Sequence, residues 1–201
     1  MDRQWAAILK FDTRRVDPGA EARHNRRMIR VIRFPLVFVV LLVSFARAEI
    51  TEQAEYSFSV KHTVTISASR ETVWEAFTGD ISGWWDHSFS GKPAKFFIEP
   101  KPGGGFIELF DDQGNGVKHG TVIYAQKPSK LNFEGPLPFN GLAMNMVHQV
   151  FFKATADGAR TELTVVCNAF GKLDPSWAEA VDGVWHHFLV ERLKPFVEGT
   201  L

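Results

Sequence analysis

Cysteine is nearly missing from this chain of 201 residues, in which Cys167 is the single example. One thiol cannot form an internal disulfide, so packing alone has to hold the fold together. The sequence also lacks His-x-His and Cys-x-x-Cys pairs, and we therefore predict neither a structural metal nor any other cofactor. It has no Gly-x-Ser-x-Gly motif, the mark of many serine hydrolases, and we interpret Cys167 as a small core residue rather than a nucleophile.

A long apolar run is missing as well. The run over residues 34–45 has 12 residues, whereas a membrane-spanning helix needs about 20. Arg30 and Arg33 precede this run, and Ala46-Arg47-Ala48 follows it. This pattern is typical of a secretory signal peptide cleaved after Ala48, which predicts a periplasmic or secreted protein. The alternative is an uncleaved N-terminal anchor.

Positive charge is scarce in the part that would remain after cleavage. Residues 1–48 hold ten of the 23 basic and four of the 23 acidic side chains, which leaves 13 basic and 19 acidic side chains. This balance argues against nucleic acid and anionic membranes as partners.

We divide the chain into an extension before the true start at Met28 (1–27), a signal peptide (28–48), a short linker (49–57) and one domain (58–198).

The domain begins with a strand and continues with helical signals. Apolar and polar residues alternate strictly over 58–66, as in a half-buried strand. Ser69 is a candidate N-cap for a short helix that ends at Gly79, and residues 80–85 suggest a second helical turn.

Turn signals then divide the chain into short segments. Glycine, proline, asparagine and aspartate separate six expected strands, at 95–99, 105–110, 117–126, 130–134, 145–154 and 160–169. Asp174-Pro175 opens a long amphipathic helix with a bulky aromatic face that runs to the end of the chain. The order predicts an α+β fold, in which a curved antiparallel sheet of about seven strands wraps around the C-terminal helix and leaves an apolar cavity between them.

Several segments resemble a known superfamily. They are Val64-Thr65-Ile66, residues 69–78, Trp84-Trp85, residues 102–106 and residues 161–165. Together with the terminal helix, they are similar to the START-like, or SRPBCC, superfamily, and most of all to homologues of the heat-shock ATPase activator, also labelled polyketide cyclase-like. The resemblance implies a helix-grip fold with a deep pocket for lipids, sterols, polyketides or other hydrophobic molecules. The predicted export departs from family members that work with a cytosolic chaperone.

Four polar side chains are candidates for chemistry in this pocket. His62 and His148 lie on apolar strand faces, and two inward imidazoles would suit acid/base catalysis. The alternative for each is a lone histidine satisfied by a hydroxyl or carbonyl group. We expect Glu108 to point outward, whereas an inward Glu108 would have a raised pKa and could act as an acid. Tyr124 either orients the polar end of a ligand or is structural.

Aromatic residues are more numerous than a core of this size requires. The predicted ligand-binding residues are Trp85, Phe97, Phe106, Tyr124, Phe133, Met146, His148, Trp185 and Phe188. The loop at 135–141 is a candidate rim over the pocket. We expect His186 and His187 near the surface, because adjacent helical residues point about 100° apart and cannot form a two-ligand pair.

These observations favour an exported protein that binds a small hydrophobic molecule in a cavity between the sheet and the C-terminal helix. One alternative is an enzyme of the cyclase or dehydratase type that uses the same pocket. The other is a protein-interaction module that resembles a co-chaperone.

Overall fold

The computed structural model describes residues 56–201. The predicted N-terminal extension, the signal peptide and most of the linker lie outside the described residues. Within residues 56–201, no helix has both the length and the apolar character needed to cross a membrane.

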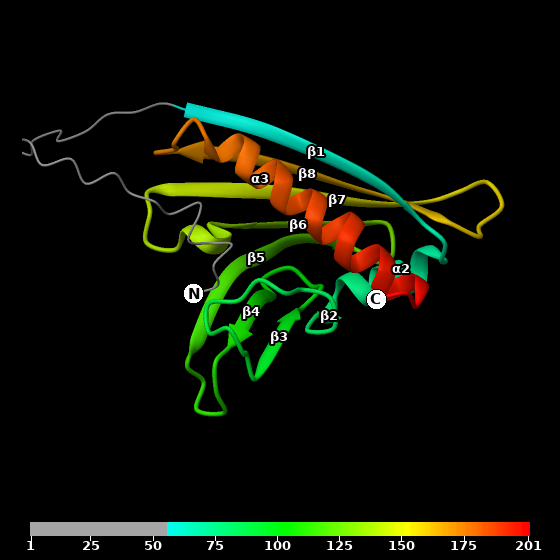
Figure 1. Cartoon of the computed structure of the whole chain (residues 1–201), viewed down its shortest axis with the longest axis horizontal. Coiled ribbons are helices and arrows are strands. Elements are labelled where there is room, and N and C mark those ends of the chain that lie inside the picture. Colours follow the sequence, from blue (N-terminus) through cyan, green and yellow to red (C-terminus); the bar gives the residue numbers. More distant parts are fainter. Residues whose placement is uncertain (1–55) are drawn as a thin grey trace, which may run out of the picture. The chain divides into compact units, whose positions relative to one another are not determined.

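Eight strands and a segmented C-terminal helix make up the described part of the chain (Figure 1). The strands are β1 (Tyr56–Ile66), β2 (Gly79–Asp80), β3 (Lys95–Ile98), β4 (Gly105–Leu109), β5 (Gly116–Gln126), β6 (Lys130–Gly135), β7 (Met144–Ala154) and β8 (Thr161–Gly171). The helical elements are α2 (Arg70–Phe77), the 3₁₀ turn η1 (Leu137–Phe139), α3 (Trp177–His186), the π-helical segment η2 (His187–Leu193) and α4 (Lys194–Glu198).

The strands form one antiparallel sheet with the order β1-β8-β7-β6-β5-β4-β3-β2. The helix-grip expectation of about seven strands is confirmed, with β2 as an additional short strand. The second helical turn expected at 80–85 begins one residue later, because Asp80 pairs with Phe97 of β3. After β2 the chain makes only a single turn, in which the Trp85 N–H donates to the Ile81 carbonyl at 2.9 Å.

Local sequence signals explain the start of α2. The side chain of Ser69 accepts a hydrogen bond from the backbone N–H of Thr72 at 3.2 Å, as expected of an N-cap. The helix ends at Phe77, and Gly79 adopts a φ of 71°, which costs a residue without Cβ little. This turn sends the chain into β2 at the edge of the sheet.

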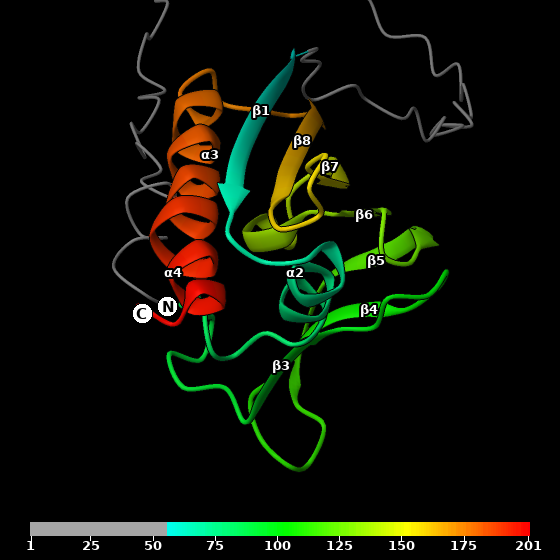
Figure 2. The same cartoon turned by 90° about the vertical axis from the view of Figure 1, so that its right-hand side faces the viewer.

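The core lies between one face of the sheet and the C-terminal helix. Alternate residues of β7 and β8 are buried, which is the period-two pattern of strands covered on one face. In Figures 1 and 2 the helix, coloured orange to red, runs alongside β1 and across this face of the sheet. Its buried residues are Trp177, Val181, Trp185, Phe188, Leu189 and Leu193.

The C-terminal helix changes its winding at η2, between α3 and α4. Pro195 lies in the first turn of α4 and has no N–H to donate to the carbonyl four residues earlier. The helix ends at Gly199, whose φ of 70° is the left-handed conformation common after a helix C-terminus. The change of winding places η2 beside the loop that follows β2.

Candidate functional site

A hollow lies between the sheet, η1 and the C-terminal helix. The residues that line it are Trp85, His119, Leu137, Pro138, Phe139, Met146, Val181, Val184, Trp185 and Phe188. Its free central space is about 20 Å³, close to the smallest volume that holds one water molecule. Counted with all gaps between atoms and the part open to solvent, the hollow measures about 420 Å³. The wide cavity expected from the sequence is therefore mostly filled in this structure.

Aromatic side chains occupy most of the space between the sheet and the C-terminal helix. The rings of Trp85 and Phe188 stack with centroids 3.8 Å apart, and Phe106 meets Trp85 edge-on at 5.0 Å. Trp185 lies 6.3 Å from Trp85 and 6.1 Å from Phe188. The three longer spacings are typical of favourable ring pairs, and the Trp85–Phe188 stack is closer still, so the interior is a packed aromatic cluster with a small opening.

Four of the predicted ligand-binding residues line the hollow: Trp85, Met146, Trp185 and Phe188. Phe106, Phe133 and His148 are fully buried in the same aromatic cluster but do not form its lining. These three residues are therefore buried beside the hollow, as the sequence suggested, but they do not contact its free space.

Phe97 and Tyr124, also predicted to bind a ligand, do not line the hollow. Phe97 is half-buried, because β3 turns its neighbours Phe96 and Ile98 into the core. Tyr124 is 42% exposed, and its hydroxyl donates to Gln126 at 2.9 Å. A register shift between Val122 and Tyr124 interrupts the alternation of β5 and turns Tyr124 outward.

His119 is a lining residue that the sequence pattern did not indicate. In β4 and β5, Phe106 pairs with Gly120 and Ile107 pairs with Lys118, so His119 is the extra residue of a bulge. Such a bulge redirects a side chain, and His119 is 5% exposed. A pattern of strict alternation gives no signal for this direction. The sequence did identify the other newly found lining segments, the rim loop and the apolar face of the C-terminal helix. Their lining residues are Leu137, Pro138, Phe139, Val181 and Val184.

Glu108 is fully buried, which corrects the expectation that it points outward. Its carboxylate accepts hydrogen bonds from the Ser88 hydroxyl at 2.9 Å, from the Phe89 N–H at 3.0 Å and from the N–H and hydroxyl of Ser90 at 3.0 and 2.9 Å. His119 Nε2 lies 3.2 Å from Glu108 Oε2 and donates to it, since an ionised carboxylate only accepts.

The pKa of Glu108 is correspondingly low. Burial by itself would raise this pKa, but the hydrogen bonds from His119 and from residues 89–90 outweigh burial and lower it to about 2. The alternative expectation, that an inward Glu108 would have a raised pKa, is therefore wrong as well, because the side chain is inward but its pKa is lowered. Glu108 is an anchor for the loop at 88–90 and for His119 rather than an acid.

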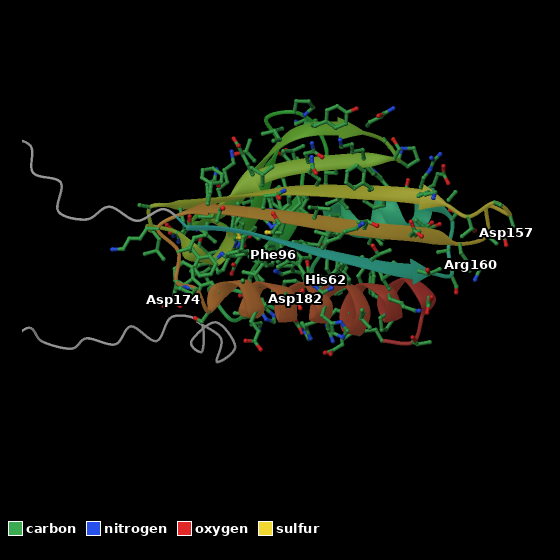
Figure 3. The ribbon with its side chains drawn as sticks, turned by 90° about the horizontal axis from the view of Figure 1, so that it is seen from above. His62, Phe96, Asp157, Arg160, Asp174 and Asp182 are labelled. Atoms are coloured by element: carbon green, nitrogen blue, oxygen red, sulfur yellow. The ribbon has the colours of Figure 1, made fainter. Side chains whose placement is uncertain are left out.

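The two candidate histidines are not paired with one another. His62 is half-buried, and its Nε2 lies 2.7 Å from Asp182 Oδ1, so that β1 and α3 are joined across the gap that Figure 3 shows. His148 is fully buried, and neither ring nitrogen has a hydrogen-bond partner within the described residues. The acid/base pair considered from the sequence does not form.

Burial also sets the charge of His148. It lowers the pKa of this imidazole to about 3, so the ring is neutral at physiological pH. The ring stacks on Phe133 at 4.5 Å and lies 5.3 Å from Trp185. The expected satisfaction by a hydroxyl or carbonyl group is absent from the described part of the chain, and His148 acts as an aromatic core residue.

A model of one family matches residues 67–198, and its description is "Activator of Hsp90 ATPase homolog 1-like protein". The chain belongs to this family. The resemblance to the SRPBCC superfamily drawn from the sequence is confirmed, and proteins with this fold commonly bind hydrophobic ligands. A comparison with curated proteins found no match.

Solved structures of bacterial proteins share the fold. A protein of unknown function from Staphylococcus aureus has a TM-score of 0.56 at 13% identity, with 73% of this chain and 96% of that chain covered. The Mll3558 protein from Rhizobium loti has a TM-score of 0.52 at 18% identity, with coverage of 74% and 100%. At such identities the similarity supports the fold of this chain and not an activity.

Proposed function

We propose that the domain binds a small, mostly apolar molecule in the hollow between the sheet and the C-terminal helix. The observation that carries this proposal is the lining, in which nine of the ten described residues are apolar and His119 is polar. A concave apolar site with a few fixed polar groups is the usual form of a small-molecule site. The hydrophobic ligands common to this fold add support.

Binding then requires the rim to move, because the free space of about 20 Å³ is too small for a ligand. The rim is η1, which contributes Leu137, Pro138 and Phe139 to the lining. Leu137 has a φ of 48°, a costly conformation for a residue with a branched side chain, and Gly141 has a φ of 90°. Displacement of η1 would free the space that its lining side chains occupy.

His119 is the polar group that would orient the ligand. Glu108 holds its ring through Nε2, and the ring also stacks on Phe96 at 5.2 Å. Because Nε2 donates to Glu108, Nδ1 of the neutral ring is left as an acceptor, which suits a ligand with one hydroxyl group on an otherwise apolar body. Affinity would come mainly from burial of apolar ligand surface, at about 25 cal/mol per Å².

Mass spectrometry of small molecules extracted from the protein, purified out of its native compartment, tests this proposal. The variant Val184→Phe enlarges a lining residue and should abolish ligand recovery. Val190→Phe is the matched control, because Val190 lies on the same C-terminal helix but is exposed. Equal recovery from both variants, or no ligand in the wild-type protein, would overturn the proposal.

The enzyme alternative is favoured by one observation, the Glu108–His119 pair at the hollow. In this alternative His119 acts on the bound molecule, while Glu108 fixes its tautomer and orientation. Incubation of the protein with its extracted ligand would then yield a product with the wild type and none with His119→Gln. An unchanged ligand after incubation with the wild type counts against catalysis.

We further propose that the domain works on the exported side of the membrane. The support is the charged, apolar and small-residue pattern over 28–48. N-terminal sequencing of the protein from its native host should find a mature chain that begins at Glu49. A chain that begins at Met1 or Met28 in the cytoplasm would contradict export.

A further inference from the structure

A second cluster of chemically active side chains lies beside the hollow. Asp86 and His87 come from the loop after β2, and His187 is the first residue of η2. The ligand-forming atoms of these three residues all lie within 4.8 Å of one another. Sequence spacing gave no sign of this cluster, because Asp86 and His187 are 101 residues apart.

The distances between these atoms are close to those of a metal coordination shell. Asp86 Oδ1 lies 2.8 Å from His87 Nδ1, and Asp86 Oδ2 lies 2.9 Å from His187 Nε2. Tetrahedral zinc, with bonds of about 2.0–2.2 Å, separates its ligand atoms by roughly 3.3–3.5 Å. The two Asp86 distances would lengthen by a few tenths of an ångström, and the His87 and His187 nitrogens, which lie within 4.8 Å of each other, would approach by up to about 1.3 Å.

The cluster is built into the fold rather than spread over a mobile surface. His87 is 3% exposed, and its ring packs against Phe188 at 4.8 Å. Its centroid lies 5.3 Å from that of His187. The two imidazoles are thus held at short range by packing, which reduces the entropy lost when both bind one ion.

Glu191 supplies the outer contact that metal-binding histidines usually have. His187 Nδ1 lies 2.7 Å from Glu191 Oε2, one helical turn further along η2. A carboxylate on the second ring nitrogen fixes the orientation of the ring and strengthens its other nitrogen as a ligand.

Arg192 favours an alternative to a metal site, in which the cluster is only a network of ion pairs and hydrogen bonds. Its Nε lies 3.2 Å from Asp86 Oδ2, but it also donates to the Trp84 carbonyl at 3.2 Å. Arg192 therefore keeps a partner when another cation takes Asp86. A metal ion would take the place of the hydrogen bonds that now join Asp86 to His87 and His187.

We propose that Asp86, His87 and His187 form a binding site for a divalent transition-metal ion, with zinc as the best fit. Two imidazole nitrogens and one carboxylate oxygen are the donor set of zinc sites that keep a fourth position open. Calcium and magnesium prefer oxygen ligands and fit this set poorly. This proposal departs from the sequence expectation of no metal.

The site adjoins the hollow through its sequence neighbours. Trp85 precedes Asp86, Phe188 follows His187, and both aromatic residues line the hollow. The proposal stands without a ligand in the hollow, so the two proposals fail or succeed separately.

Isothermal titration of the full chain, prepared without a histidine tag, with Zn²⁺ tests the site. We expect one Zn²⁺ per chain, and binding at least 100-fold weaker for Asp86→Asn and His187→Gln, since loss of an outer-shell partner alone costs about 10- to 100-fold. His186→Gln is the matched control, because His186 is adjacent, exposed and outside the cluster. Its affinity should equal that of the wild type.

Two further variants keep the test decisive if a ligand variant misfolds. Glu191→Gln changes an exposed side chain and should weaken Zn²⁺ binding by about 10- to 100-fold. Arg192→Gln removes a neighbouring positive charge and should strengthen it. Absence of stoichiometric binding, equal loss in His186→Gln, or unchanged binding in Asp86→Asn and Glu191→Gln would mean an adventitious metal only and overturn the proposal.

Discussion

Glu108 is the residue that organises the wall of the hollow. Its carboxylate takes donors from the loop at 88–90 on one side and from His119 on the other. A buried charge is tolerated only when such partners satisfy it, and removal of the charge leaves several donors without an acceptor. The loop and the orientation of His119 therefore depend on one ionised group.

The low pKa of Glu108 predicts a loss of stability in acid. The folded-state pKa of about 2 is below the ordinary value of 4.5, so this group stabilises the fold above pH 4.5 and loses its contribution as the pH falls toward 2. A shift of this size corresponds to about 3 kcal/mol of unfolding free energy. Urea unfolding measured between pH 7 and pH 3 should show the decline.

The variant Glu108→Gln isolates this contribution. We expect it to be less stable than the wild type at pH 7 by roughly 2–4 kcal/mol. Its curve should also fall less steeply between pH 4.5 and pH 3, although Asp86, whose pKa is also about 2, adds its own decline. Parallel curves for the two proteins would show that Glu108 is not the titrating group.

His148, unlike Glu108, lowers the stability of the folded domain. A buried imidazole without hydrogen bonds is destabilising, because water satisfied both ring nitrogens in the unfolded chain. His148→Leu should therefore raise the free energy of unfolding by about 1–2 kcal/mol, as measured by urea unfolding. Met146→Leu, a swap of similar volume on the same strand, is the control and should change stability little. A destabilised His148→Leu protein would indicate that the imidazole has a partner in solution.

At the scale of elements, two irregularities in β5 decide what faces the hollow. The bulge at His119 turns a polar ring inward, and the shift near Tyr124 turns an aromatic ring outward. Strand positions could be predicted because alternation and turn residues are local signals. A bulge depends on pairing with a neighbouring strand, so the directions of His119 and Tyr124 could not be predicted from the same pattern.

Two glycines, one in α3 and one at the end of β6, should respond to alanine with opposite signs. Gly183 lies within α3, and a Cβ there meets no heavy atom of the described chain within 4 Å, so Gly183→Ala should stabilise by about 0.5–1 kcal/mol. At Gly135 a Cβ would collide with the backbone of His119 and Gly120, so Gly135→Ala should destabilise by several times that amount. Thermal unfolding measures both effects. A stabilised Gly135→Ala variant would mean that β5 and β6 can move apart freely.

At the scale of the whole domain, the order of strands and the terminal helix followed from the sequence. The predicted strands agree with the observed ones to within about two residues at each end, since hydrophobic period and turn chemistry act over short distances. The size of the cavity could not be predicted from the sequence. Whether Trp85, Phe106 and Phe188 meet or leave a gap depends on packing between distant segments, which no local pattern encodes.

A bound ligand should stabilise the whole domain. A molecule that fills the hollow binds the folded state alone, and at 100 times its Kd it adds about 2.7 kcal/mol to the free energy of unfolding. Thermal unfolding of ligand-free protein with and without the extracted molecule checks this. Val184→Phe should show no such gain, whereas a gain equal to that of the wild type would place the ligand elsewhere.

The lining of the hollow comes from side chains on segments whose backbones are fixed by other contacts. β5 and β7 are held by strand pairing, and the C-terminal helix is also anchored by Trp177, Leu189 and Leu193, which are buried but do not line the hollow. Substitutions at the lining therefore alter what fits without redirecting the chain. Under the proposed binding function, a few substitutions at the lining would therefore exchange one ligand for another while the backbone scaffold stays the same.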